Sequence, residues 1–289
     1  MNPFVTENTP PTIFDRKRLR LRRARSAASH GADDFLHQRA MADIVDRLEA
    51  VNRSFNTAVF YGASNLTGML TQRCDVGEII QCDLARERLA GCERRVIFDD
   101  EHLPLADASV DLFVSVLTLH STNDLVGALA QIRKALKPDG LFIAAMFGEN
   151  TLRGLRAAIT AAQSDKGNGF QARFSPMAAI QDLGAAMMRA GFTLPALDID
   201  RVNVVYNDPM KLIADLRGMG ETNILSGEIR PLTREVFAEA MARFAADGGT
   251  ENFEIVYLTG WAPHPDQQKP LQPGSAKASL KDAIEKNIT

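Results

Sequence analysis

The chain has 289 residues, of which 45% are hydrophobic and 24% are charged, and its formal net charge is −3 at pH 7. This length and composition predict one large globular domain, or one domain with a sizeable insertion, that buries a substantial core. The small negative charge argues against a general nucleic-acid binder, which needs a strongly basic face. No apolar run reaches the roughly 18 residues of a membrane-spanning helix, so no transmembrane segment is expected.

The cysteines and the first residues bear on the cellular compartment. Cys74, Cys82 and Cys92 are odd in number and lack C-x-x-C spacing, a pattern that predicts neither a disulfide framework nor a zinc site. The first 15 residues are polar and contain proline, without the apolar centre of a secretory signal. We therefore expect a cytoplasmic protein with free thiols and no metal site.

Residues 1–33 are expected to form a basic N-terminal arm. Seven cations fall within the ten residues from Arg16 to Arg25. Such a density of positive charge favours an acidic partner, a phosphate group or an anionic surface. The simpler alternative is a solvated helix that packs through the few apolar residues of this stretch, which are Phe14, Leu19 and Leu21.

A strand and a tight turn follow an amphipathic helix that the apolar spacing predicts over residues 34–51. Residues 58–68 begin as an apolar strand, pass through glycine and small residues, and then open a helix. In this geometry the backbone amides of the turn point at a bound nucleoside cofactor. The residues of the turn that we expect to contact the cofactor are Tyr61, Gly62, Ala63 and Ser64.

Two further strands end in acids. Residues 78–83 predict a strand that ends in Asp83, at the offset from the glycine turn where a carboxylate accepts hydrogen bonds from ribose hydroxyls. The alternative role for Asp83 is to cap a helix over residues 84–89. Residues 95–98 predict a third strand, after which Asp99 or Asp100 is expected to accept from an adenine amino group. A solvated acidic turn is the alternative for this pair.

The central strand is predicted over residues 110–120, which are nearly continuously apolar, as a strand buried on both faces should be. His120 at its carboxyl end is the candidate general base, and a hydrogen-bonded structural histidine is the alternative. A helix over residues 125–136 and a strand over residues 141–147 follow. Strands that alternate with helices predict an open parallel sheet with right-handed crossovers.

The second half predicts more helices and an antiparallel strand pair. Strands are expected over residues 200–206 and 253–261, with a helical insertion over residues 207–250 between them. Such an insertion lies above the carboxyl edge of the sheet and shapes the substrate side. The expected organisation is therefore one α/β domain over residues 34–262, followed by a flexible tail over residues 263–289.

Nearly the whole chain resembles known proteins, and this resemblance implies a methyltransferase-like domain over residues 34–262. The glycine turn, Asp83, the acids after the third strand and the strand ending at His120 resemble class I S-adenosylmethionine-dependent methyltransferases. The chain is more similar to the complex I assembly factor 5 family, and more distantly to methyltransferases that act on a malonyl carrier-protein ester. The segments that resemble the assembly factors are Phe14-Asp15-Arg16, Asn123-Asp124-Leu125, Ala145-Met146-Phe147-Gly148, Thr151-Leu152, Gly218-Met219-Gly220-Glu221-Thr222-Asn223 and Gly260-Trp261.

This resemblance implies a Rossmann-like, seven-stranded α/β sheet with helices on both faces and a helical insertion before the last strand. It implies S-adenosylmethionine as the cofactor and a subunit of the respiratory NADH dehydrogenase as a protein substrate, because the mitochondrial member is described as hydroxylating an arginine of such a subunit. Leu84 and Leu117 join the expected cofactor contacts, while Asn123, Glu221 and Asn223 are expected on the substrate side. Glu221 either binds a guanidinium as a charged fork or caps a helix.

The chain departs from the family pattern in the turn. Phe60 stands where an acid is usual, and Ser64 and Leu66 stand where further glycines are usual. Loss of a charged acceptor costs about 1.5 to 3 kcal/mol of binding free energy, which weakens the expected cofactor affinity at least about tenfold. Two alternatives to a protein-modifying enzyme therefore remain open: a small-molecule or carrier-protein methyltransferase, and a non-catalytic assembly protein whose cofactor turn has decayed.

Overall fold

The computed structural model describes residues 12–28, 34–165 and 171–267. The remainder of the expected arm and of the expected tail lies outside these ranges. The helices are α1 (Arg16–Ser26), α2 (Phe35–Val51), α3 (Thr67–Arg73), α4 (Leu125–Ala135), α5 (Arg153–Asp165), α6 (Ile180–Arg189), α7 (Pro209–Met219) and α8 (Arg234–Ala246), with short 3-10 turns η1 (Ser64–Leu66), η2 (Arg86–Leu89) and η3 (Leu119–Ser121). The strands are β1 (Phe55–Tyr61), β2 (Val76–Asp83), β3 (Arg95–Ile97), β4 (Val110–Val116), β5 (Leu136–Phe147), β6 (Thr193–Val205) and β7 (Thr250–Trp261).

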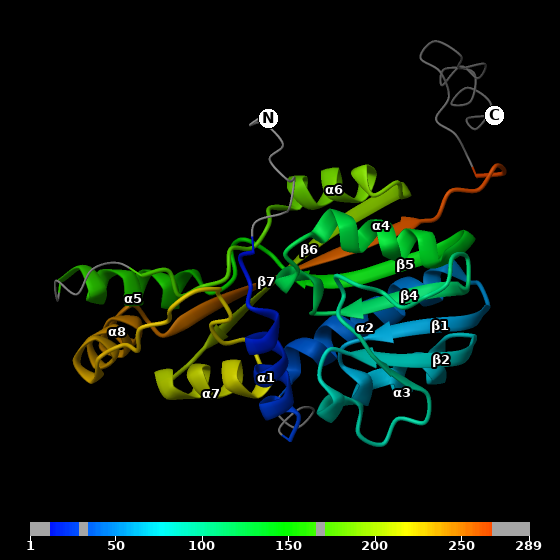
Figure 1. Ribbon diagram of the computed structural model, residues 1–289. Coiled ribbons are helices and arrows are strands. Elements are labelled where there is room, and N and C mark those ends of the chain that lie inside the picture. The colour runs from blue at the N-terminus through cyan, green and yellow to red at the C-terminus, as the bar shows by residue number, and fades with distance from the viewer. Residues whose placement is uncertain (1–11, 29–33, 166–170, 268–289) are drawn as a thin grey trace, which may run out of the picture.

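All seven strands form one sheet in the order β3-β2-β1-β4-β5-β7-β6. The first five strands are parallel, whereas β7 runs antiparallel to both β5 and β6. Between β6 and β7 the chain contributes α7 and α8. The predicted Rossmann-like fold, with seven strands and a helical insertion before the last strand, is therefore confirmed (Figure 1).

Helices cover both faces of the sheet because the inward residues of each strand alternate between two apolar cores. Phe60 is fully buried in the core that includes residues of α2, α3, α5, α7 and α8, whereas Tyr61 faces the core that includes α4 and α6. Figure 1 shows α4 and α6 on the same side of the sheet. Because β1 is covered on both faces, its run of apolar residues can be continuous.

Several strand boundaries differ from the prediction. The central strand β4 ends at Val116, so His120 lies in the turn η3 and not in the strand. The strands β5 and β6 begin well before the predicted residues. The stretch from Lys137 to Gly140, expected as the end of a helix, belongs to β5, which begins at Leu136 and pairs there with Val110 of β4. β6 starts at Thr193 rather than at residue 200. Its pairing with β7 runs along the whole strand, so cross-strand hydrogen bonds extend it beyond the part that sequence alternation revealed.

The α1 helix packs onto the domain through apolar contacts. Phe14 and Leu19 are buried in a small cluster with Leu84 and Ile224. Asp15 caps the helix by accepting a hydrogen bond from the backbone amide of Arg18. Figure 1 places α1 at the arrowheads of the central parallel strands, so this helix covers the edge where a ligand of this fold binds.

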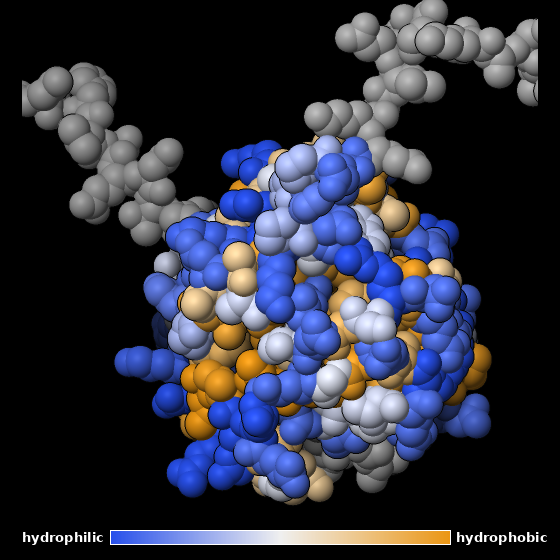
Figure 2. All heavy atoms as spheres, turned by 90° about the vertical axis from the view of Figure 1, so that its right-hand side faces the viewer, coloured by the Kyte–Doolittle hydropathy of each residue, from blue (hydrophilic) through white to orange (hydrophobic). Residues whose placement is uncertain are grey.

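The opposite end of the molecule carries the amino ends of the parallel strands. Figure 2 shows hydrophilic and hydrophobic residues interspersed over that face.

Within the described residues, the structure contains no helix with both the length and the apolar character needed to cross a membrane.

The turn after β1 provides a test of how tightly the chain is packed there. Gly62 has a φ of +81°, and a Cβ atom at this position would lie 2.5 Å from Thr118 Cγ2 and 2.7 Å from the carbonyl oxygen of Val116. We expect Gly62→Ala to lower the unfolding free energy by about 2 kcal/mol or more, measured by chemical denaturation. Gly68→Ala is the matched control, because a Cβ atom there meets nothing within 4 Å. Equal stability of the two variants would contradict this assignment.

Candidate functional site

The turn after β1 is fixed by its neighbours on both sides. The amide of Gly62 donates to the carbonyl oxygen of Cys82 at 3.0 Å. Ala63 has a φ of +42° and Leu117, across the turn at the end of β4, a φ of +48°. Left-handed backbone at non-glycine residues is uncommon and gathers at functional sites. The predicted contacts Gly62, Ala63 and Leu117 thus come together where β1 and β4 end.

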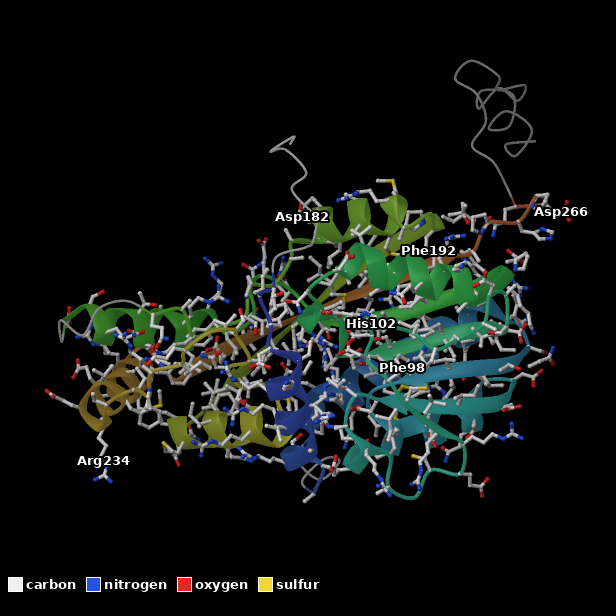
Figure 3. The ribbon with its side chains drawn as sticks, viewed as in Figure 1. Phe98, His102, Asp182, Phe192, Arg234 and Asp266 are labelled. Carbon is white, nitrogen blue, oxygen red and sulfur yellow. The ribbon has the colours of Figure 1, made fainter. Side chains whose placement is uncertain are left out.

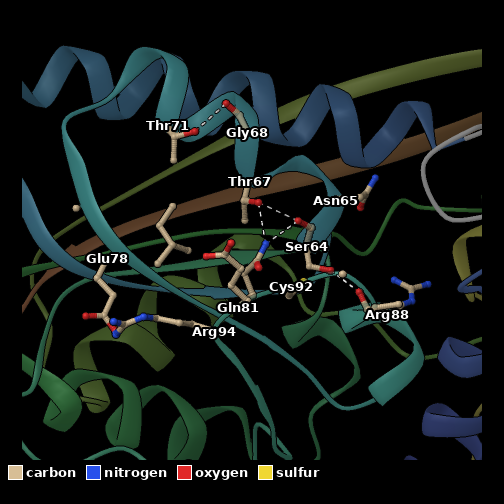
Figure 4. A pocket seen from close by; sticks show the side chains of 15 residues that line it. Ser64, Asn65, Thr67, Gly68, Thr71, Glu78, Gln81, Arg88, Cys92 and Arg94 are labelled. Carbon is tan, nitrogen blue, oxygen red and sulfur yellow. Dashed lines mark hydrogen bonds and ion pairs between the residues drawn. The ribbon is translucent and has the colours of Figure 1, made fainter.

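Ser64 points away from that junction. Its hydroxyl donates to the carbonyl oxygen of Arg88, and Gln81 on β2 donates to the Ser64 carbonyl oxygen at 3.0 Å and to Thr67 Oγ1 at 2.8 Å. Figure 4 shows this network on the wall of an open hollow of about 720 Å³. Neither Gly62 nor Asp83 lines the hollow. Of the expected cofactor contacts, Ser64 thus lines the hollow, whereas Gly62 and Asp83 do not.

Asp83, the last residue of β2, is only 1% exposed. Its Oδ1 accepts from the amide of Ala85 at 2.8 Å, so its side chain closes a local turn instead of capping a helix over residues 84–89. Arg23 of α1 lies against it, with Nη1 3.5 Å from Oδ1. Asp83 Oδ2 and Arg23 Nη1 are both buried without a hydrogen-bond partner. An unsatisfied acceptor and an unsatisfied donor therefore lie side by side at the expected ribose position.

The acids after β3 are paired with α1 as well. Arg16 donates from Nη2 to Asp99 Oδ1 at 2.6 Å and also bonds Asp100. Burial alone lowers the pKa of Arg16, but the carboxylates of Asp100 and Asp99 more than offset this and raise it. Burial likewise tends to raise the pKa of Asp99, but the guanidinium of Arg16 holds it below its ordinary value. Both groups are therefore charged at neutral pH.

Tyr61 contacts both an acid and an aromatic ring at this edge. Its hydroxyl donates to Asp100 Oδ1 at 3.2 Å, and Thr122 bonds the other oxygen of that carboxylate. Burial, and then the charge of Asp100, raises the pKa of Tyr61 well above its ordinary value. The ring stacks on Phe98 at 5.2 Å between centroids, and Figure 3 labels Phe98 near the ends of the central strands. Arg23 lies over the ring of Tyr61, 5.8 Å from its centroid.

Two of the predicted contacts serve to hold the N-terminal segment. Asn123 Oδ1 accepts from the amides of Ile13 and Phe14, each at 2.8 Å, and Leu84 packs in the small apolar cluster under α1. The sequence did not identify this role. The basic stretch was the sequence signal for this role. Its Arg16 and Arg23 point inward, to the acids that follow β3 and end β2, and do not lie on a solvated face.

His120 and Glu221 form a pair at the end of β4. His120 Nε2 and Glu221 Oε2 are 3.1 Å apart, and the histidine side chain is 2% exposed against 21% for the glutamate. The histidine ring also packs against Phe147, with 5.0 Å between ring centroids. Burial tends to raise the pKa of Glu221, but the charge and hydrogen bond of His120, and then Arg23, lower it overall. Glu221 is therefore an ionised carboxylate.

Glu221 follows the end of α7, where Gly220 takes a φ of +86° as the C-cap. The amide of Glu221 donates to the carbonyl oxygen of Leu216 at 2.8 Å, so only its backbone belongs to the helix end. Its side chain is directed to His120. Of the two roles considered for Glu221, the structure does not support the helix cap.

A largely apolar cavity of about 170 Å³ opens beside Glu221, at the carboxyl end of β5. The sequence analysis missed it, because its walls come from distant segments: the end of β5, α5, residues 173–177, α7 and β7. Glu221 and Asn223, two of the expected substrate-side residues, line it, and Arg156 and Arg173 bring positive charge. Among its apolar walls are Phe147, Leu155, Ile159, Phe174, Ile213 and Phe253.

The fold and this edge define the class of protein. A family model described as a methyltransferase domain matches residues 61–144, which span the turn, the acids and the central strand. The YcgJ protein from Bacillus subtilis has the same fold, with a TM-score of 0.54 at 13% identity over 78% of this chain and 99% of that one. The chain thus has the fold of class I methyltransferases.

Closer relatives identify the family. A Danio rerio protein named arginine-hydroxylase NDUFAF5, mitochondrial, is 34% identical over 285 residues, which cover 93% of this chain and 89% of the relative. A malonyl-[acyl-carrier protein] O-methyltransferase of Methylovorus sp. (strain MP688) is 31% identical over 90% of this chain and 95% of its own length. The chain belongs to the NDUFAF5 family.

The cytoplasmic location predicted from the sequence is contradicted by these relatives, since the NDUFAF5 proteins of Danio rerio, Mus musculus and Homo sapiens are named as mitochondrial. The prediction used the free thiols, which do not separate one reducing compartment from another.

The Glu221–His120 pair gives a prediction for pH dependence. Because the folded-state pKa of Glu221 is lowered, its contribution to stability is fully present above the ordinary glutamate pKa of about 4.3 and is lost as pH falls through the folded-state pKa. We expect the unfolding free energies of wild type and Glu221→Gln to differ above about pH 5 and to converge in acid. Glu228→Gln, at an exposed side chain, should follow wild type. A difference that persists in acid would argue against an ionised Glu221.

Proposed function

We propose that the chain binds S-adenosylmethionine where β1, β2 and β4 end, and that it modifies an arginine side chain of a protein substrate. The observation that carries the proposal is the ionised Glu221, which pairs with His120 just beyond the central strand and lines a largely apolar cavity. A carboxylate in such a place is a strong hydrogen-bond acceptor for a guanidinium. The names of the NDUFAF5 relatives state an arginine hydroxylase.

Two atoms at the cofactor edge support this placement of an adenosine. Asp83 Oδ2 and Arg23 Nη1 are buried without a hydrogen-bond partner, and a ribose hydroxyl, which both donates and accepts, would supply a partner for each. Asp99, whose side chain is 26% exposed, has acceptor capacity left for an adenine amino group. Phe60 lies fully buried in the core and leaves the β1 end without the usual acid. This supports cofactor binding that is weaker than the family norm.

When bound, S-adenosylmethionine supplies an electrophilic methyl carbon on a sulfonium. For a guanidinium nitrogen of the substrate to accept that methyl group, the carboxylate of Glu221 would take the N–H proton that the nitrogen loses. In hydroxylation, dioxygen and a two-electron reductant are needed, so that one oxygen atom enters a substrate C–H bond and the other leaves as water. In either case Glu221 and His120 orient the guanidinium.

A second candidate function is supported by the cations of the same cavity. Arg156 and Arg173 line it together with Glu221, and guanidinium groups favour an acceptor that bears a carboxylate. The Methylovorus relative is named as a methyltransferase of a malonyl carrier-protein ester. Methylation of an acidic acceptor is therefore the alternative that the substrate experiment must separate from arginine modification.

Cofactor binding can be tested by calorimetric titration with S-adenosylmethionine. We expect binding to the wild type, and at least about tenfold weaker binding to Asp83→Asn, because the variant loses a charged acceptor for the ribose. Glu87→Gln is the matched control, since Glu87 is exposed on the neighbouring turn η2. Absence of heat with millimolar ligand and wild-type protein would leave the non-catalytic assembly protein as the better description.

The substrate can be tested by mass spectrometry of respiratory NADH dehydrogenase subunits, which the family resemblance implies as substrates. We compare cells that lack the chain with cells complemented by wild type, Glu221→Gln or Glu228→Gln. The modified arginine should be present with wild type and Glu228→Gln, and reduced at least about 100-fold with Glu221→Gln. The added mass distinguishes a methyl group from an oxygen atom. A pattern that the deletion leaves unchanged would reject this substrate, and loss of activity in Arg156→Gln on an acidic acceptor would favour the second candidate.

A further inference from the structure

A second, larger cavity of about 830 Å³ lies where α1 and α7 meet the segment around residue 173. It shares part of its wall with the Glu221 cavity, since Ile159, Arg173 and Thr222 line both. The two cavities are therefore neighbours. Five cations line the larger one, namely Arg22, Arg25, Arg173, Lys211 and Arg217, against a single acid, Asp215.

The single acid does not neutralise these cations. Asp215 is 3.0 Å from Lys211 and its side chain is 8% exposed, so the two form a pair of their own. Arg22 has a buried Nε with no hydrogen-bond partner among the described residues. Burial, and then the like charges of Arg25, Arg18 and Arg217, lowers its pKa. The cavity therefore has an excess of positive charge that the described residues do not balance.

Arg173 adds to this excess at the boundary between the two cavities. Its Nη1 donates to the carbonyl oxygen of Arg230 at 2.8 Å, but its Nε is buried without a partner. Burial lowers its pKa. Buried guanidinium atoms that lack an acceptor cost free energy, which an anionic ligand would offset.

We propose that the cavity between α1 and α7 docks an acidic segment of the protein substrate, next to the arginine that enters the Glu221 cavity. This inference rests on the proposed function, because it assigns the larger cavity to the same substrate. Carboxylates of the segment pair with Arg22, Arg25 and Arg217, which line the larger cavity. The substrate arginine that lies between these carboxylates enters the neighbouring Glu221 cavity.

The arrangement gives the site a means of choosing its substrate. A free arginine, or an arginine in a basic segment, meets the like charges of the larger cavity before it reaches Glu221, and like-charge contacts disfavour a partner. Acidic residues on both sides of the substrate arginine turn this repulsion into attraction. The helix α1 thus divides its arginines between two tasks: Arg16 and Arg23 pair with the acids of the cofactor edge, whereas Arg22 and Arg25 face the larger cavity.

Fluorescence anisotropy with two labelled peptides tests the proposal. One peptide carries glutamates on both sides of a central arginine, and the other carries glutamines at the same positions. The test variant is Arg25→Gln with Arg217→Gln, both exposed residues of the cavity rim. The matched control is Lys17→Gln with Arg20→Gln, which removes the same charge from exposed positions outside the cavity.

We expect the glutamate peptide to bind wild type and the control alike, and to bind the test variant at least about tenfold more weakly. Added salt should weaken this binding and leave the glutamine peptide weak throughout. Equal binding of the two peptides, or equal binding of the test variant and the control, would overturn the proposal. Displacement by inorganic phosphate at lower concentration than peptide, or anionic lipid vesicles binding where the peptide does not, would also overturn it.

Peptide binding, measured together with modification of the substrate, separates this inference from the proposed function. If Glu221→Gln binds the glutamate peptide normally and the modification in cells is absent with wild type as well, the docking site stands and the arginine-modifying function fails. If both peptides are modified equally well and the test variant is fully active, the function stands and the docking site fails.

Discussion

The pairing of α1 with the acids that end β2 and β3 is the interaction on which the site depends. Arg23 faces Asp83, and Arg16 bonds Asp99 and Asp100. Buried carboxylates without partners are costly, and removal of one member of such a pair typically destabilises a protein by about 3 to 5 kcal/mol. The helix therefore neutralises the acidic edge, and its position gives that edge its shape.

The fold was largely predictable from the sequence, because a doubly covered parallel sheet produces strong local patterns. The apolar run of β4 and the glycine turn after β1 are signals that a few neighbouring residues carry. The extent of β6 was not predictable in this way, since hydrogen bonds from β7 decide it. Residues 137–140 were predicted as the end of a helix because their composition is typical of a turn. Pairing with β4 makes them part of β5.

For the candidate site, the sequence predicted which residues gather at the carboxyl edge but not what they contact. Gly62, Asp83 and Leu117 meet there because parallel strands end at one edge. Asn123 and Leu84, whose ligand contacts stay a prediction, also hold the N-terminal segment. The pairing of His120 with Glu221 joins residues 101 positions apart, and no local pattern reports such a contact. The same holds for the two cavities, whose walls come from distant segments.

The division of α1 between two neighbouring spaces has a thermodynamic consequence. One side of this short helix meets the acids of the cofactor edge, and another borders the basic cavity. A ligand in either space that displaces the helix changes the free energy of occupying the other, and linkage requires the two effects to be equal in size. The position of this eleven-residue helix thus decides how strongly a ligand at the cofactor edge and a ligand in the basic cavity affect each other's affinity.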